Sequence, residues 1–409
     1  MKSSDYTQCI VQFQMLENVK LKLVVYRGEI DVLAGAYAIQ RYCSGRKPNS
    51  IKADQSAILN LYRFCEGNDI DLVYRIANQQ PLTIGEIEAF SLYCSFRRDD
   101  GERAGVGLYK SRMRVALGFI SYIWMFHQDA LANQPDKLEA SRTNYERMER
   151  AFKIYEKAPY QGERKDKLGL TENLQTRFFE IISPAEGNTL NPWRSHKIKW
   201  RNYILLMLIV LSGNRKGETL QLKLNHLQLT GPRKYFEILK PKKEISYIRA
   251  EAPSIKTLGR QVDLHEDFAE LLIYYIENIR TLFRGGSKTS FVFISHRDGC
   301  ELSLQTPNAI LNDVVKLYPE FKGLLSPHRL RNTFHDLLNE ALEKKFKDES
   351  PLSKKILKSP IQEAAGGWTH GSEMPDHYSK GNIQARVSDF HLKIQEQIAS
   401  KLFRFDRDE

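Results

Sequence analysis

The stretch that decides the fold is residues 326–340, SPHRLRNTFHDLLNE. Ser326 is a typical helix N-cap and Pro327 suits the first helical position, so a helix is expected to begin here. His328 and Arg331 are three residues apart and therefore share one face of its first turn. Helix N-terminal amides, an imidazole and a guanidinium would converge there and could bind an anion. The alternative is a histidine that packs locally beside a solvated arginine.

Two basic segments precede this helix in the chain. In residues 213–218, GNRKGE, Arg215 stands at the junction of two expected helices. It can clamp Glu218 or present its planar guanidinium to a phosphate. Residues 254–260, SIKTLGR, form the tip of an expected hairpin that carries Lys256, although exposed lysines of this kind are usually idle. The lysines that compete with it for a functional role are Lys240, Lys242 and Lys243.

A turn-rich segment follows the helix at residues 364–380, AAGGWTHGSEMPDHYSK. Tyr378 is not patterned like a core aromatic, and Trp368, His370 and His377 stand near it in the sequence. By itself such a tyrosine is more often a packed amphipathic residue with its hydroxyl in water. Two arginines, a lysine and a histidine precede it, without a carboxylate cluster for a metal. This set suits phosphoryl transfer through an activated hydroxyl.

The order of these motifs resembles that of the tyrosine recombinases, the phage integrase family. GNRKGETLQLKLNHL is similar to the first arginine box of that family, KTLGRQVDL to its lysine hairpin, and PHRLRNTFHDLLNE to its His-x-x-Arg box. Each motif alone is weak, but all of them in one order are specific. The catalytic residues that the resemblance implies are Arg215, Lys256, His328, Arg331, Trp368 or His370, and Tyr378.

Two departures from the family pattern affect this assignment. Asn214 stands before Arg215, where the family has a hydrophobic residue. Trp368 lies ten residues before Tyr378 and His370 lies eight before it, one more and one fewer than the family spacing. Trp368 is favoured because it follows a Gly-Gly pair, and His370 is the alternative.

The resemblance implies a mechanism in which Tyr378 attacks a DNA phosphodiester, forms a 3′-phosphotyrosine link and releases a 5′-hydroxyl. Because the pKa of free tyrosine is about 10, the hydroxyl must lose its proton during attack. No metal ion, nucleotide or other cofactor is implied, since the phosphotyrosine conserves the bond energy. The implied roles are general base for His328, general acid for Lys256, and phosphate binding for Arg215, Arg331 and Trp368 or His370.

The same resemblance implies a double-stranded DNA recombination site as partner, a homo-tetramer on DNA, and service to a mobile genetic element. Residues 384–402 are an amphipathic helical candidate for the contact between protomers, or else a helix that packs on its own domain. A topoisomerase-like or telomere-resolving enzyme would share the chemistry. The alternative from another class is a catalytically inactive DNA-binding regulator that retains the fold.

Net charge, apolar runs and cysteine spacing limit the partners and the cellular location that can be expected. The net charge is +11, and residues 196–260 hold 14 lysines and arginines against four glutamates, which favours a polyanionic partner over a mere solubility face. No apolar run reaches the roughly 18 residues of a membrane span, and the N-terminus lacks a signal-peptide block, so we expect a cytoplasmic protein without membrane contact. The cysteines show no CxxC pairing and predict neither disulfides nor a zinc site: Cys9, Cys43, Cys65, Cys94 and Cys300.

The expected fold class is α+β: mainly α with a small antiparallel β-sheet in the C-terminal domain. Residues 1–45 are an N-terminal appendage with a strand at 20–26, and residues 46–130 form a helical domain that resembles the family's core-binding, DNA-binding domain. Residues 131–190 are a linker with one helix at 141–157. Residues 191–409 form a domain that resembles the family's catalytic domain, with a C-terminal helical tail.

Overall fold

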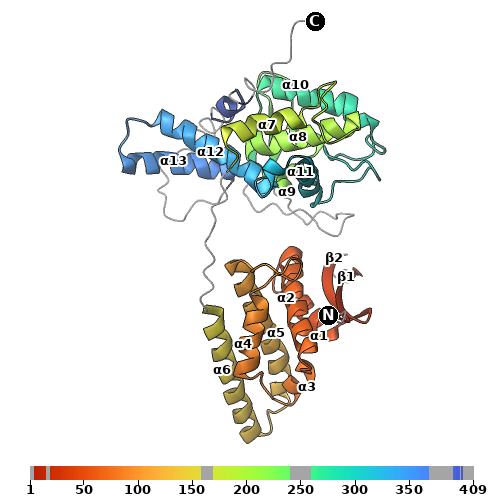
Figure 1. Cartoon of the computed structure of the whole chain (residues 1–409), viewed down its shortest axis with the longest axis vertical. Coiled ribbons are helices and arrows are strands. Elements are labelled where there is room, and N and C mark those ends of the chain that lie inside the picture. Colours follow the sequence, from red (N-terminus) through yellow and green to blue (C-terminus); the bar gives the residue numbers. More distant parts are fainter. Residues whose placement is uncertain are drawn as a thin grey trace. The chain divides into compact units, whose positions relative to one another are not determined.

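The computed structural model describes residues 4–14, 19–157, 169–239, 259–367, 390–396 and 398. The chain forms two compact units, Met1–Lys165 and Asp166–Glu409, coloured red to olive and green to blue in Figure 1. Both units are mainly helical, and each holds a three-stranded antiparallel sheet. The expected fold class is therefore confirmed. The sheet of the first unit was not predicted.

In the first unit a β-meander packs on helices. Its strands are β1 (Tyr6–Phe13), β2 (Val19–Tyr26) and β3 (Glu29–Ile30). Gln55, which is buried on α2 (Pro48–Gly67), accepts from the Val24 backbone amide at 3.0 Å and donates to the Ala34 carbonyl at 2.8 Å. The strand expected at residues 20–26 is thus β2, and it contributes Leu21, Leu23, Val24 and Val25 to the buried interior. The described residues of the expected N-terminal appendage, 1–45, therefore pack within this unit through hydrogen bonds and apolar contacts.

Six helices of the first unit share one apolar core. Thr83 and Glu86 form a capping box at the start of α4 (Ile84–Cys94). The last helix extends the expected segment 141–157 to residue 135, and Ser141 accepts from the buried Trp124 indole at 3.1 Å. The helices are α1 (Val32–Cys43), α2 (Pro48–Gly67), α3 (Leu72–Ala77), α4 (Ile84–Cys94), α5 (Val106–Asp129) and α6 (Pro135–Lys157).

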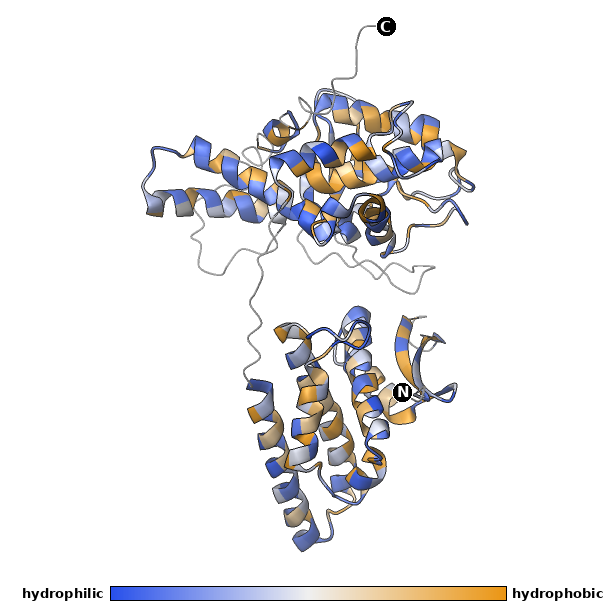
Figure 2. Ribbon diagram, in the orientation of Figure 1, coloured by the Kyte–Doolittle hydropathy of each residue, from blue (hydrophilic) through white to orange (hydrophobic). Residues whose placement is uncertain are grey.

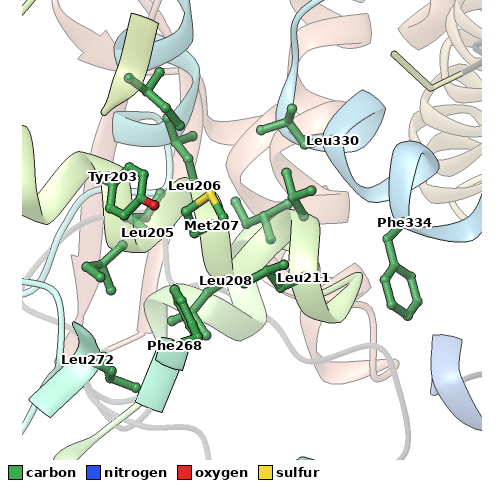
Figure 3. Packing of buried hydrophobic residues seen from close by; sticks show 14 of the residues in the cluster. Tyr203, Leu205, Leu206, Met207, Leu208, Leu211, Phe268, Leu272, Leu330 and Phe334 are labelled. Carbon is green, nitrogen blue, oxygen red and sulfur yellow. The ribbon is translucent and has the colours of Figure 1, made fainter. Parts of the chain in front are cut away.

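The second unit is built around α8 (His196–Ser212). Every residue from Arg201 to Ser212 is buried, and a helix that is apolar on all sides must be enclosed by other elements. Figure 2 shows α8 largely in the hydrophobic colour, and Figure 3 shows its Leu208 and Leu211 among aromatic and aliphatic neighbours that include Phe268 and Leu330. α8 therefore supplies the rigid base on which the flanking elements are placed.

The other elements of this unit surround α8. Its sheet has the order β4-β5-β6. Phe291 and Ile294 form two isolated bridges outside this sheet, and the Phe291 carbonyl accepts from the buried Arg280 side chain. The elements are α7 (Glu172–Ile182), α9 (Lys216–Leu220), β4 (Leu227–Gln228), β5 (Tyr235–Ile238), β6 (Arg260–Asp263), α10 (Glu266–Tyr274), α11 (Thr306–Leu317), α12 (Pro327–Lys345) and α13 (Pro351–Gly366).

The stretch expected as a linker, residues 131–190, holds a second helix that the sequence did not reveal. α7 buries Phe178 and Phe179 in the core of the second unit. Before it, the Gly169 amide donates to Asp336 at 2.8 Å and the Leu170 amide to Thr333 at 2.9 Å, both on α12. The roles assigned to the four regions remain predictions. Over the described residues, no helix combines the length and apolar character needed to cross a membrane.

Candidate functional site

A tight turn after α8 places the first candidate residue. Gly213 ends the helix with φ of +61°, and a Cβ there would lie 2.2 Å from the Phe334 ring, so only glycine fits. The turn leaves Arg215 as the N-cap of α9. Its amide donates to Glu218 at 3.0 Å, and its guanidinium contacts the other carboxylate oxygen at 3.3 Å. The Glu218 side chain is completely buried, whereas that of Arg215 is 33% exposed.

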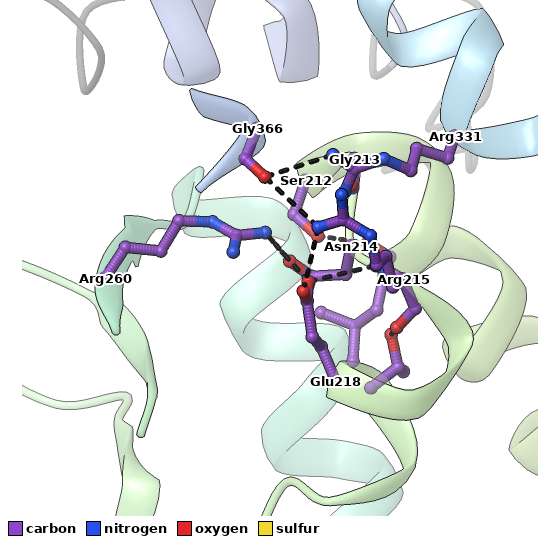
Figure 4. Close-up of polar contacts among 10 residues, drawn as sticks. Ser212, Gly213, Asn214, Arg215, Glu218, Arg260, Arg331 and Gly366 are labelled. Atoms are coloured by element: carbon purple, nitrogen blue, oxygen red, sulfur yellow. Dashed lines mark hydrogen bonds and ion pairs between the residues drawn. The ribbon is translucent and has the colours of Figure 1, made fainter. Parts of the chain in front are cut away.

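The second candidate arginine reaches the same place from α12. Arg331 is buried and donates through Nη1 to the Gly213 carbonyl and through Nη2 to the Gly366 carbonyl at 3.0 Å. Arg215 Nη1 also contacts the Gly366 carbonyl, at 3.4 Å (Figure 4). The carbonyls at a helix C-terminus carry partial negative charge. The two guanidinium groups therefore converge on one electronegative position at the end of α13.

A third arginine, Arg260 on β6, completes the cluster. Its Nη2 donates to Asn214 Oδ1 at 2.9 Å and to Glu218 Oε2 at 3.0 Å, and its side chain is 6% exposed. Burial, with Arg215 and Arg260 nearby, lowers the pKa of Arg331 to about 9 even though Glu218 opposes the shift. Two guanidinium groups contact the Glu218 carboxylate, and that of Arg331 lies close enough to feel its charge. The cluster therefore has an excess of positive charge and suits an anionic ligand.

The predicted residues divide into those that the structure places and those outside the described residues. Arg215 and Arg331 are brought together, and Ser326 caps the Arg329 amide at 3.2 Å as predicted. His328 is exposed in the first turn of α12, one turn before Arg331. The residues outside the described part are Lys240, Lys242, Lys243, Lys256, Trp368, His370, His377 and Tyr378.

Three further polar residues near the cluster were missed. Arg260 lay inside the quoted lysine-hairpin motif but was not singled out. His335 follows Arg331 by four residues on α12, a spacing that places both on one face. Burial, then Arg331, Arg260 and Arg215, lowers the pKa of His335 to about 3. His391 is buried at 1% exposure, and burial followed by Arg260 lowers its pKa to about 4. No local pattern signals the burial of His391.

The described part of the C-terminal tail, residues 390–396 and 398, packs on its own unit. Phe390, Ile394 and Ile398 belong to the core of the second unit. Gln395 accepts from the His265 amide at 2.6 Å and donates to the Asp263 carbonyl at 2.9 Å. For these residues the structure shows the self-packed alternative.

Comparison with known proteins finds a family match in this region. Residues 183–345, from the residue after α7 to the end of α12, match the model of the Phage integrase family. Arg215, Arg260, His328 and Arg331 all fall within the match. A search of curated proteins finds no match to the chain.

Several solved structures resemble the chain at low identity. The XerH site-specific recombinase bound to a palindromic difH substrate is 18% identical, with 86% of this chain and 96% of that chain covered and a TM-score of 0.36. The Tn1549 transposon integrase in complex with a circular intermediate DNA is 13% identical, with 87% and 98% covered and a TM-score of 0.48. An integrase from mycobacterium phage Brujita is 11% identical, with 92% and 93% covered and a TM-score of 0.31.

Proposed function

We propose that this protein is a site-specific DNA recombinase or integrase that cuts and rejoins DNA through a 3′-phosphotyrosine intermediate. The observation that carries the proposal is the convergence on one oxygen of Arg215 and Arg331, two arginines inside the region that matches the phage integrase family. Paired guanidinium groups fit the non-bridging oxygens of a phosphodiester. They also stabilise the charge that grows there during phosphoryl transfer.

In this proposal the phosphodiester oxygen takes the position now held by the Gly366 carbonyl. Tyr378 attacks the phosphorus, the 3′ side of the strand stays bonded to the tyrosine oxygen, and the 5′ oxygen leaves. The segment that carries Tyr378 follows directly on Gly367, which caps α13 with φ of +61°. We assign His328 as general base, Lys256 as general acid, and Trp368 or His370 as a further phosphate contact.

We also propose the partners that belong to this chemistry. The substrate is a double-stranded recombination site, which agrees with the basic window at residues 196–260. The working form is a homo-tetramer on DNA, in the service of a mobile genetic element and in the cytoplasm. The reaction uses no metal or other cofactor. The first unit contributes DNA binding through its helical residues 46–130.

Replacement of the nucleophile tests the proposal. The recombination site is first located as an inverted repeat in the DNA that flanks the gene. Wild type should then form a covalent protein–DNA adduct on a nicked suicide substrate, and Tyr378→Phe should form none. Tyr274→Phe is the matched control, because Tyr274 is 40% exposed on α10 and its ring contact with Trp200 survives the change.

Two outcomes contradict the proposal. If Tyr378→Phe forms as much adduct as wild type, the nucleophile is wrong. If wild type binds the site but forms no adduct, the protein is the second candidate, a catalytically inactive DNA-binding regulator.

A further inference from the structure

We infer that Arg260 is a positioning residue for the proposed cleavage reaction, which acts by sharing Glu218 with Arg215. The inference rests on the proposed function and deepens it. Arg260 does not contact the Gly366 carbonyl through any bond in the described structure, so its effect on the phosphate must pass through a neighbour. That neighbour is Glu218, which is bonded to Arg260 at 3.0 Å and to Arg215 at 3.3 Å.

The Glu218 carboxylate is shared between Arg215 and Arg260. Oε1 of Glu218 faces Arg215 Nη1, whereas Oε2 accepts from the Arg215 amide and from Arg260 Nη2 (Figure 4). The carboxylate is held from both sides and cannot turn wholly toward Arg215. The Arg215 contact stays long, and the same Nη1 still reaches the Gly366 carbonyl at 3.4 Å. Arg215 is thereby kept available to a ligand.

A gain in stability does not account for the burial of Arg260 beside Glu218. Its Nε and Nη1 are buried without a hydrogen-bond partner among the described residues, as is Nδ2 of Asn214. Buried donors without partners reduce stability, and a surplus of positive charge does so as well. Such local costs are expected where a site is organised for a ligand.

Arg260 also adds a positive charge to the arginine cluster. Arg260 lies close enough to lower the pKa of Arg331 and of His335, so it adds to the positive potential at the point where the two phosphate-binding arginines meet. The bound phosphodiester is the anion that this surplus fits. Arg260 therefore leaves the cluster with a surplus of positive charge, and its specific action on the phosphate is the restraint of Arg215 through Glu218.

Two variants of Arg260 test the inference. Arg260→Met keeps an unbranched apolar stem but removes charge and donors, so Glu218 should draw Arg215 away from the phosphate position. We expect adduct formation on a suicide substrate to slow by about 10- to 100-fold, the size expected when a reacting group is displaced by roughly 1 Å. Binding of the same DNA should change by less than about threefold, because Arg260 is buried. Arg260→Lys should be intermediate.

A substrate with a methylphosphonate at the scissile position separates positioning from misfolding. In it a methyl group replaces one non-bridging oxygen and removes the negative charge, so the demand on Arg215 is smaller. On this substrate the ratio of the wild-type rate to the Arg260→Met rate should be at least about tenfold smaller than on the phosphate substrate. The double variant Arg215→Ala/Arg260→Met should be no slower than Arg215→Ala on the phosphate substrate, because two residues that act through one group are not additive.

The matched control is Arg280→Met, which removes a buried arginine that donates to the Gly286, Thr289 and Phe291 carbonyls. Arg280→Met should lower the melting temperature. It should change the rate of adduct formation by the same factor on the phosphate and methylphosphonate substrates. If Arg260→Met behaves in the same way, or as wild type, the inference is overturned. Absence of adduct in wild type would instead reject the proposed function.

Discussion

Arg215 and Arg331 donate to the same oxygen, the Gly366 carbonyl, at 3.4 and 3.0 Å, although one lies on the turn after α8 and the other on α12. The position between their guanidinium groups is therefore already shaped for an oxygen that bears negative charge. Preorganised donors of this kind cost little reorganisation when charge develops. If a phosphodiester oxygen takes this position, as we propose, the end of α13 must give up its contact with the two arginines.

Arg215→Ala should slow adduct formation by about 10²- to 10³-fold, because one donor to the transition state is lost. The free energy of unfolding should change little, since Glu218 keeps Arg260 as a partner and Arg215 is partly exposed. The measurements are suicide-substrate kinetics and thermal unfolding. Arg177→Ala is the control, because Arg177 pairs with Glu180 at the same spacing and distance on α7, outside the site. Equal rates for the two variants would contradict the role of Arg215.

Gly213→Ala should destabilise the second unit by about 2 to 5 kcal/mol, the sum of left-handed strain and overpacking against Phe334. Gly187→Ala is the matched control, since Gly187 has φ of +76° but a Cβ added to it would meet nothing within 4 Å. It should lose only about 1 to 2 kcal/mol. Denaturant unfolding measures both. Equal losses would show that Phe334 does not close this turn.

The stability of the second unit should fall as the pH drops below about 6.5. His391 has a folded-state pKa of about 4 against 6.5 when unfolded, so the unfolded chain binds more protons in this window. Its contribution is complete above pH 6.5 and is lost as the pH falls toward 4, roughly 2 kcal/mol between pH 6.5 and pH 5. His391→Phe should flatten that part of the profile, measured by denaturant unfolding. Parallel profiles for variant and wild type would contradict the prediction.

Gln395→Ala should loosen the C-terminal segment from its own unit. The His265 amide and the Asp263 carbonyl each lose a partner, at a cost of about 1 to 3 kcal/mol per buried group. Hydrogen exchange of peptides that span residues 390–398 should speed up. Gln362→Ala is the control, because its 3.3 Å bond to Asn339 is exposed. Unchanged exchange in Gln395→Ala would show that the apolar residues alone hold the segment.

Local features of the site were accessible from the sequence, whereas its assembly was not. The N-cap at Ser326 and the junction of two helices at Arg215 each depend on neighbours within four residues. The burial of Arg260 and His391 depends on segments far apart in the chain. So does the placement of residues 4–14 and 19–26 on α2, because a hairpin acquires a buried face only when a partner covers it.

The sequence by itself determined the mainly helical class, the order of the basic motifs and the face shared by His328 and Arg331, because helix periodicity and capping are local. Only the tertiary structure decided that Arg215 and Arg331 meet at the Gly366 carbonyl. It also decided that Arg260 shares Glu218 and that Gln395 ties the tail to its own unit. These contacts join residues more than 30 positions apart, and packing around the buried α8 brings them together.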